Sequence, residues 1–241
     1  MRIFLTFFVL LITGFSAVAI HNPIIYGPSN ILGFSTDIFY RLRSFYPNEQ
    51  YRIVQNPDQQ TRVEDIINYI HLFSGHKFYN DFHDVYILNE TSGEPNAWST
   101  GRSVFITNSL LKILSDRELT AVLAHELAHE ERAHLLRRLA VPIGSIVIAA
   151  YNAIKGSGKT APSVIIEEFR TGTEIEADCI AAKWLLHMRD LGLKNDPEDL
   201  LAATEKILVK DYFMYLDAND APVLRYYAIK NKVYMHDACG L

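Results

Sequence analysis

Hydrophobic and polar residues recur along the chain with the periods of both helices and strands. Within residues 62–73 the aliphatic positions lie three or four apart, which predicts an amphipathic helix. Two shorter segments, 83–88 and 103–107, are rich in β-branched and aromatic residues and predict strands. Glycine, proline and asparagine within 89–95 predict a loop after the first of these strands.

A further helix is predicted to begin after Ser115. The sequence Ser115-Asp-Arg-Glu118 matches a capping box, in which the serine hydroxyl accepts from one main-chain amide and the glutamate accepts from another. This helix carries AHELAHEERAH, residues 124–134, with three of the nine histidines of the chain. A later helix is predicted over 173–184, where three alanines would let it approach the histidine-bearing helix closely.

The first nineteen residues have the pattern of a signal peptide. Arg2 precedes an apolar stretch, and Gly14 and the pair Ala17 and Ala19 follow it, so cleavage after Ala19 is predicted. The alternative is an uncleaved anchor, because residues 3–20 are barely long enough to cross a bilayer core of about 30 Å. Export predicts a place in the periplasm or cell envelope, with secretion as the alternative.

Length and composition indicate one globular domain. The 241 residues are 49% hydrophobic and 21% charged, which suits a substantial core. The predicted division is the signal peptide at 1–19, an N-terminal extension packed on the domain at 20–60, and the domain at 61–241. The net charge of −5, without a basic run, argues against nucleic acid as a partner.

Two cysteines, Cys179 and Cys239, are too few for a disulfide framework and have no Cys-x-x-Cys spacing. Cys179 falls inside a predicted helix, so the favoured prediction is a small buried residue without a partner. Pairing is the alternative in an oxidising compartment.

The longest uncharged stretch after the leader is 139–154. A helix of this length rises only about 24 Å, short of the bilayer core of about 30 Å. We therefore expect an apolar helix packed on the domain, and peripheral membrane contact is the alternative.

His125 and His129 are four residues apart, so their imidazoles leave one face of the predicted helix and can meet one ion. Zinc suits neutral imidazole ligands. Glu126 lies one residue further round, where it can take a proton from a water on the metal, as HExxH sequences on helices do. The alternative is a solvated polar face in which the histidines are incidental.

A catalytic zinc needs a third protein ligand. The extended pattern HExxHxxGxxH would need glycine and histidine where Arg132 and Leu135 stand, so the ligand must come from another element. Glu174 is the best donor, and Asp178, one turn later, is placed to accept the spare N–H of a liganding histidine. An ordinary acidic helix start is the alternative explanation for these carboxylates.

The pair of motifs His125-Glu-Leu-Ala-His129 and Glu174-Ile-Glu-Ala-Asp178 resembles the HtpX and CAAX-protease-related family of gluzincin zinc peptidases. Residues 94–102 are similar to the Asn-Ala-Phe segment of that family, and 195–197 match the turn before a late helix. The resemblance spans roughly residues 62–241.

The resemblance implies an α+β, zincin-like metallopeptidase domain, mainly helical, with a small mixed sheet whose edge strand binds peptide. It implies one Zn²⁺ per chain, bound by His125, His129 and Glu174. Glu126 would be the general base, and Asp178 would accept a hydrogen bond from a liganding histidine. A peptide substrate would lie extended along the edge strand. The residues implied for that strand and the segment leading into it are Asn96, Ala97, Ser103, Val104, Phe105, Ile106 and Thr107.

One position departs from the family pattern. Relatives often carry His-Pro before the last helix, whereas this chain has Ala221 before its proline. An oxyanion needs a further donor beside the metal, and Arg225, Tyr226 and Tyr227 are candidates by position only.

These observations predict a zinc metalloendopeptidase that hydrolyses envelope or exported proteins, with Glu126 activating a zinc-bound water. Two alternatives stay open: a catalytically weak zinc-binding chaperone or interaction protein of the same fold, and a secreted protease that acts on foreign proteins.

Overall fold

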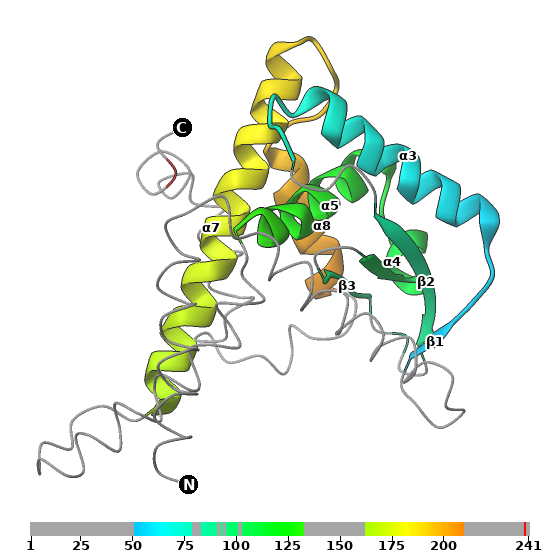
Figure 1. Ribbon diagram of the computed structural model, residues 1–241, viewed down its shortest axis with the longest axis horizontal. Helices are drawn as coiled ribbons and strands as arrows, with labels where there is room; N and C mark the ends of the chain where they lie inside the picture. The colour runs from blue at the N-terminus through cyan, green and yellow to red at the C-terminus, as the bar shows by residue number, and fades with distance from the viewer. Residues whose placement is uncertain are drawn as a thin grey trace, which may run out of the picture.

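The computed structural model describes residues 51–78, 83–90, 93, 95–100, 103–132, 162–209 and 239 of the chain (Figure 1). The elements in chain order are β1 (Tyr51–Ile53), α3 (Pro57–Phe73), β2 (Asp84–Glu90), β3 (Ala97–Ser99), β4 (Ser103–Thr107), α4 (Asn108–Ile113), α5 (Asp116–Glu131), α7 (Pro162–Asp190) and α8 (Glu198–Val209). The predicted leader, the apolar stretch 139–154 and the three candidate oxyanion donors lie outside the described residues. No helix in the described ranges is long and apolar enough to cross a membrane.

The amphipathic helix predicted over residues 62–73 is confirmed, and it begins five residues earlier than its apolar pattern indicated. α3 begins at Pro57, where the side chain of Asn56 caps it by accepting from the amide of Gln59. Its predicted aliphatic face is buried. The predicted boundary at residue 60 therefore falls inside α3, and β1, also assigned to the extension, is a strand of the sheet.

Four strands form a small mixed sheet in the order β1-β2-β4-β3. β2 and β4 are parallel, and the two outer strands are antiparallel to their neighbours. Together with the helices this confirms a mainly helical fold with a small mixed sheet.

The prediction that residues 103–107 form the edge strand is wrong. β4 is paired on both sides, with β2 and with β3, and all five of its residues are buried. A run of buried residues without alternation is typical of a central strand covered on both faces. Because β3 pairs with β4 on the side away from β2, the outer position beside β4 belongs to β3.

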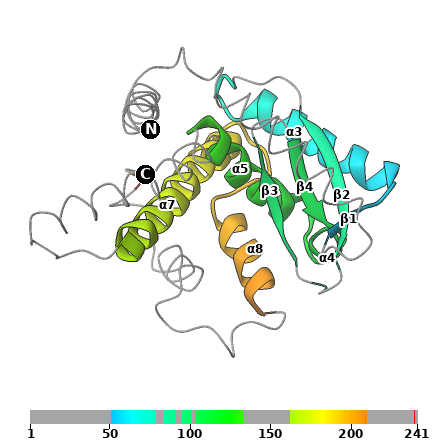
Figure 2. The same cartoon turned by 60° about the horizontal axis from the view of Figure 1, so that its bottom comes forward.

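α5 is the central element of the described fold. It lies between α7 and the sheet, and it also contacts α3 and α8 (Figure 2). The predicted capping box is present: Glu118 accepts from the amide of Ser115 at 2.8 Å, and Ser115 accepts from the amide of Glu118 at 3.5 Å. Buried leucines at 119, 123 and 127 join α5 to the core. The helix that carries the histidines is therefore fixed on several sides.

The prediction that Cys179 has no partner is wrong. Cys179 of α7 forms a disulfide with Cys239, with Cα atoms 5.2 Å apart. The two positions are 60 residues apart in sequence, so no local spacing could indicate the pair. The bond fastens the chain at residue 239 to α7, one residue after Asp178.

Candidate metal centre

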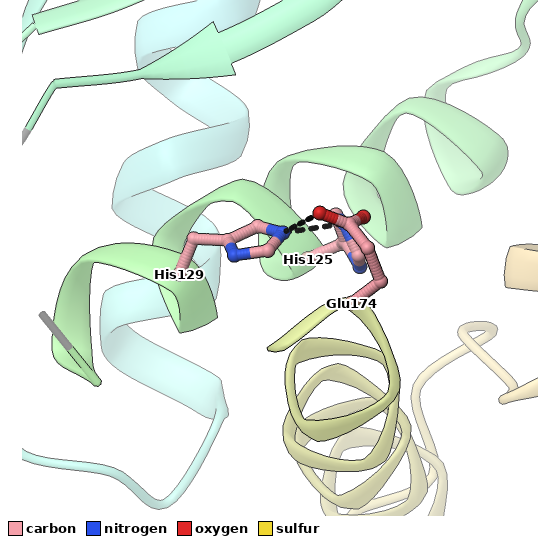
Figure 3. A group of neighbouring side chains, drawn as sticks. All are labelled: His125, His129 and Glu174. Carbon is pink, nitrogen blue, oxygen red and sulfur yellow. Dashed lines mark hydrogen bonds and ion pairs between the residues drawn. The ribbon is translucent and has the colours of Figure 1, made fainter. Parts of the chain in front are cut away.

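Three side chains from two helices converge on one point. The Nε2 atoms of His125 and His129, both on α5, lie 2.9 Å apart with the rings nearly perpendicular. Glu174 of α7 faces them across the helix interface: its Oε2 lies 3.4 Å from Nε2 of His125, and its Oε1 lies 3.4 Å from Nε2 of His129 (Figure 3). The structure therefore brings together the three residues that the sequence singled out as ligands.

The close approach of the two helices depends on small residues. Ala121, Ala124 and Ala128 on α5 and Ala177 and Ala181 on α7 are completely buried in the shared core. Since alanine places only a methyl group between the backbones, the ligand side chains can meet across the interface. The α5–α7 contact is the most extensive between any two described elements.

The chemistry and spacing of the donors fit a tetrahedral zinc ion. Neighbouring ligand atoms around such an ion are about 3.4 Å apart, because each bond is about 2.0–2.2 Å. The two carboxylate-to-imidazole distances of 3.4 Å match this spacing, and the imidazole pair is slightly closer. The side chains of His125, His129 and Glu174 are only 7%, 11% and 19% exposed. Two imidazoles and one carboxylate leave a fourth position for water, as in catalytic zinc sites.

Asp178 lies behind the first histidine. Its Oδ1 is 2.7 Å from Nδ1 of His125, and its side chain is buried. A carboxylate accepts, so Nδ1 carries the ring proton and the lone pair of Nε2 faces Glu174. This is the arrangement predicted for Asp178, and it resembles the carboxylate–histidine pairs that orient metal ligands.

Glu126 follows His125 on the same helix and is half-buried. Its main-chain carbonyl oxygen accepts a hydrogen bond of 3.0 Å from the hydroxyl of Ser99, the last residue of β3. The sequence pattern had not singled out Ser99, because nothing within β3 shows which helix its side chain meets. The edge strand and the predicted general base are thus directly linked.

The two glutamates that follow His129 are packed rather than solvated. Glu130 pairs with His83 at 2.9 Å, and both side chains are at least nine-tenths buried. Glu131 pairs with His76 at 3.0 Å and is 6% exposed. Both glutamates are therefore part of the packed interior and not of a solvated helix face. Sequence reasoning missed both histidine partners because they lie 47 and 55 residues away.

The other predicted site residues are divided between two strands. Ala97 belongs to the edge strand β3, which contacts α5, and Asn96 precedes it. The five residues from Ser103 to Thr107 lie one strand further in and are buried. Arg225, Tyr226 and Tyr227 are outside the described residues.

Comparison with known proteins agrees with this geometry. Residues 57–192 match the model of peptidase family M48, so the match covers more than half of the chain and includes both helices of the metal centre. The protease HtpX homolog of Methylibium petroleiphilum is 46% identical over 57 residues, which is 22% of this chain and 19% of that protein. The homolog from Burkholderia cenocepacia is 44% identical over a segment of equal length. The match therefore spans about a fifth of the length of these curated relatives.

Among solved structures, Ste24p of S. mikatae aligns with 75% of this chain and 50% of its own chain. The TM-score is 0.39 and the sequence identity 14%.

Proposed function

The chain belongs to peptidase family M48, and on that premise we propose that it is a zinc metalloendopeptidase of zincin-like fold that cleaves envelope or exported proteins. The observation that carries the proposal is the convergence of His125, His129 and Glu174 from two helices within the matched segment. These imidazole and carboxylate groups are buried at this spacing, and a buried aspartate contacts one imidazole. The arrangement fits a metal-binding site better than it fits a structural ion pair.

In this proposal His125, His129 and Glu174 hold one Zn²⁺ per chain. When bound, the ion would supply a Lewis acid that polarises the scissile carbonyl and the attacking water. Asp178 keeps the ring proton of His125 on Nδ1 and so keeps its Nε2 lone pair directed into the site.

Glu126 is the proposed general base. Its carboxylate takes the proton of the attacking water as the carbon–oxygen bond forms, and delivers a proton to the leaving nitrogen as the carbon–nitrogen bond breaks. Its position one residue from His125, on a helix fixed by a capping box and by core leucines, supports this role. For the oxyanion, Arg225, Tyr226 and Tyr227 are retained as proposed donors from their place in the sequence.

The substrate is proposed to be a peptide in extended conformation added to β3. Main-chain pairing of this kind tolerates many side-chain sequences, which suits a protease with broad substrates. The contact of β3 with α5 supports this choice, because a peptide on the open side of the strand lies next to the helix that carries Glu126.

Export to the periplasm or cell envelope is proposed for the location, with peripheral membrane contact as a secondary feature. The Cys179–Cys239 disulfide supports export, because disulfides persist in oxidising compartments and are rare elsewhere. The signal-like pattern of residues 1–19 supports it independently.

Proteolysis by the purified chain tests the enzymatic proposal. Wild type with zinc should cleave casein, and Glu126→Gln should bind zinc equally but lose at least about 1,000-fold in rate, because the base is removed and the ligands remain. Equal cleavage by both proteins would rule out Glu126 as the base. Suppression of client aggregation without cleavage by wild type would instead favour the chaperone alternative.

Metal analysis tests the ligand set separately. Glu174→Ala should lose most of the stoichiometric zinc after dialysis, whereas Glu176→Ala should keep it. Glu176 is a matched control because it lies on the same helix and pairs with Arg132 at 3.0 Å. Retention of tightly bound zinc by Glu174→Ala would assign the third ligand to another residue.

A further inference from the structure

One side-chain hydrogen bond joins the edge strand to the helix of the metal centre. The hydroxyl of Ser99 donates to the main-chain carbonyl oxygen of Glu126 at 3.0 Å. A carbonyl oxygen has two lone pairs, so this bond is compatible with the hydrogen bond that the same carbonyl makes along the helix. The two residues are 27 positions apart, and only the tertiary fold brings them together.

The main-chain N–H and C=O groups of β3 point alternately toward β4 and away from it. The amide of Thr107 donates to the carbonyl of Asn96, and the amide of Thr100 donates to the carbonyl of Ser103, each at 3.0 Å. Along an antiparallel strand, residues whose N–H and C=O point at the partner alternate with residues whose groups point away. Positions 96, 98 and 100 therefore face β4, and Ala97 and Ser99 present their N–H and C=O groups to the opposite side.

The opposite side of β3 is the outer edge of the sheet. Among the strands in the described residues, none pairs with β3 there. The side chain of Ser99 lies on the face that β4 turns toward the helices, because Ser99 is in register with Val104, a residue of the core. Ser99 thus presents its main chain to the open edge and its hydroxyl to α5.

We propose that Ser99 is a positioning residue that fixes the register of a bound peptide relative to Glu126. This inference rests on the proposed function. A peptide paired with Ala97 and Ser99 is held to β3, and the hydroxyl–carbonyl bond holds β3 to the helix turn that carries the general base. Removing the bond leaves the peptide-pairing groups intact but allows the scissile carbonyl and the Glu126 carboxylate to shift relative to each other.

The test measures turnover and binding separately, on the full zinc-loaded chain with an extended octapeptide. Ser99→Ala should lower kcat about tenfold, since displacement by about 1 Å costs up to about 100-fold and β4 still holds the strand. KM should stay within about twofold, because the main-chain groups remain. Ser99→Thr restores a hydroxyl and should recover most of kcat.

Thr204→Val is the matched control. The Thr204 hydroxyl donates to the carbonyl of Leu200 at 2.7 Å, which is also a hydroxyl-to-carbonyl bond but lies within α8, a helix that supplies none of the proposed ligands. Its loss should leave kcat and KM unchanged. A binding readout without turnover comes from the fluorescence of Trp98, in β3, in the Glu126→Gln protein. Adding Ser99→Ala to that protein should change the Kd for the octapeptide by less than about twofold.

Three results would overturn the inference while leaving the proposed function intact: unchanged kcat in Ser99→Ala, a loss that appears only in KM, or no recovery in Ser99→Thr. The proposed function is intact in these experiments if wild type cleaves the substrate and Glu126→Gln does not. If wild type with zinc cleaves neither casein nor the octapeptide, the proposed function fails and the role of Ser99 fails with it.

Discussion

Nδ1 of His125 lies 2.7 Å from Oδ1 of Asp178, and the aspartate side chain is 2% exposed. A buried carboxylate is costly without a donor, and the imidazole N–H supplies one. The same contact fixes the ring orientation and the tautomer of the histidine, so one aspartate on α7 sets the direction of a proposed ligand on α5.

Asp178→Asn should therefore lower zinc affinity about 10- to 100-fold, because the neutral amide supports the imidazole less well than the carboxylate. Competition with a chromogenic chelator measures the affinity directly. Asp199→Asn is the control, since Asp199 is also buried but pairs with Arg117 at 2.8 Å, away from the site. Unchanged zinc affinity in Asp178→Asn would contradict the orienting role.

Features that depend on neighbours a few residues apart were predictable from the sequence. The buried face of α3 follows from its aliphatic period, and the capping box follows from Ser115 and Glu118 alone. The pairing of His125 with His129 also follows from helical geometry. Their meeting with Glu174 was predictable only because the chemistry of a metal site requires a third ligand.

Features that depend on strand order and long-range packing were not predictable. The place of β4 inside the sheet follows from its pairing with β2 on one side and β3 on the other, and that strand order is a long-range property. The Cys179–Cys239 bond and the His83–Glu130 pair join segments 60 and 47 residues apart. Ser99 lies in the same category, since its partner is a main-chain carbonyl that every residue has.

Ala181 should be sensitive to added volume. It is completely buried in the core that α5 and α7 share, so a leucine there has no room and must push the helices apart. Ala181→Leu should lower the free energy of unfolding by about 1–3 kcal/mol and weaken zinc binding, because Glu174 moves with α7. Urea unfolding and chelator competition measure the two effects.

Ala202→Leu is the control for added volume. Ala202 of α8 is partly exposed and lines an open surface pocket, so the larger side chain can extend into solvent. It should leave zinc affinity unchanged. An Ala181→Leu protein with wild-type stability and zinc affinity would mean that the helix spacing is not set by the small residues.

The Cys179–Cys239 disulfide should contribute substantially to stability. It closes a loop of about 60 residues, and the loss of chain entropy in the unfolded state corresponds to about 4 kcal/mol. Cys239→Ala should lower the free energy of unfolding by up to this amount, and reduction of wild type should produce the same loss. Reductant should not affect Cys239→Ala further. Two titratable thiols in the unreduced, denatured wild type would contradict the bond.

Glu118 links the start of α5 to α8 through charge. Its carboxylate accepts from Ser115 and from Nζ of Lys206, each at 2.7 Å. Burial acts to raise its pKa, but the hydrogen bonds from Lys206 and Ser115 outweigh burial, so the pKa lies below its ordinary value of 4.5. Because the folded pKa is below the unfolded one, the ionised carboxylate stabilises the fold at pH above the unfolded value. That contribution is lost as the pH falls through the folded value.

Glu118→Gln should therefore lower the free energy of unfolding at pH 7 by about 1 kcal/mol, a modest amount because Lys206 is half-exposed. The difference from wild type should shrink as the pH falls below 4.5. Urea unfolding of both proteins from pH 7 downward measures this difference. Lys206→Met separates the two hydrogen-bond partners, since it leaves the capping box in place and should reproduce only part of the loss. A difference that stays constant across the acid range would show that the amide alters packing, and that the charge of Glu118 contributes nothing.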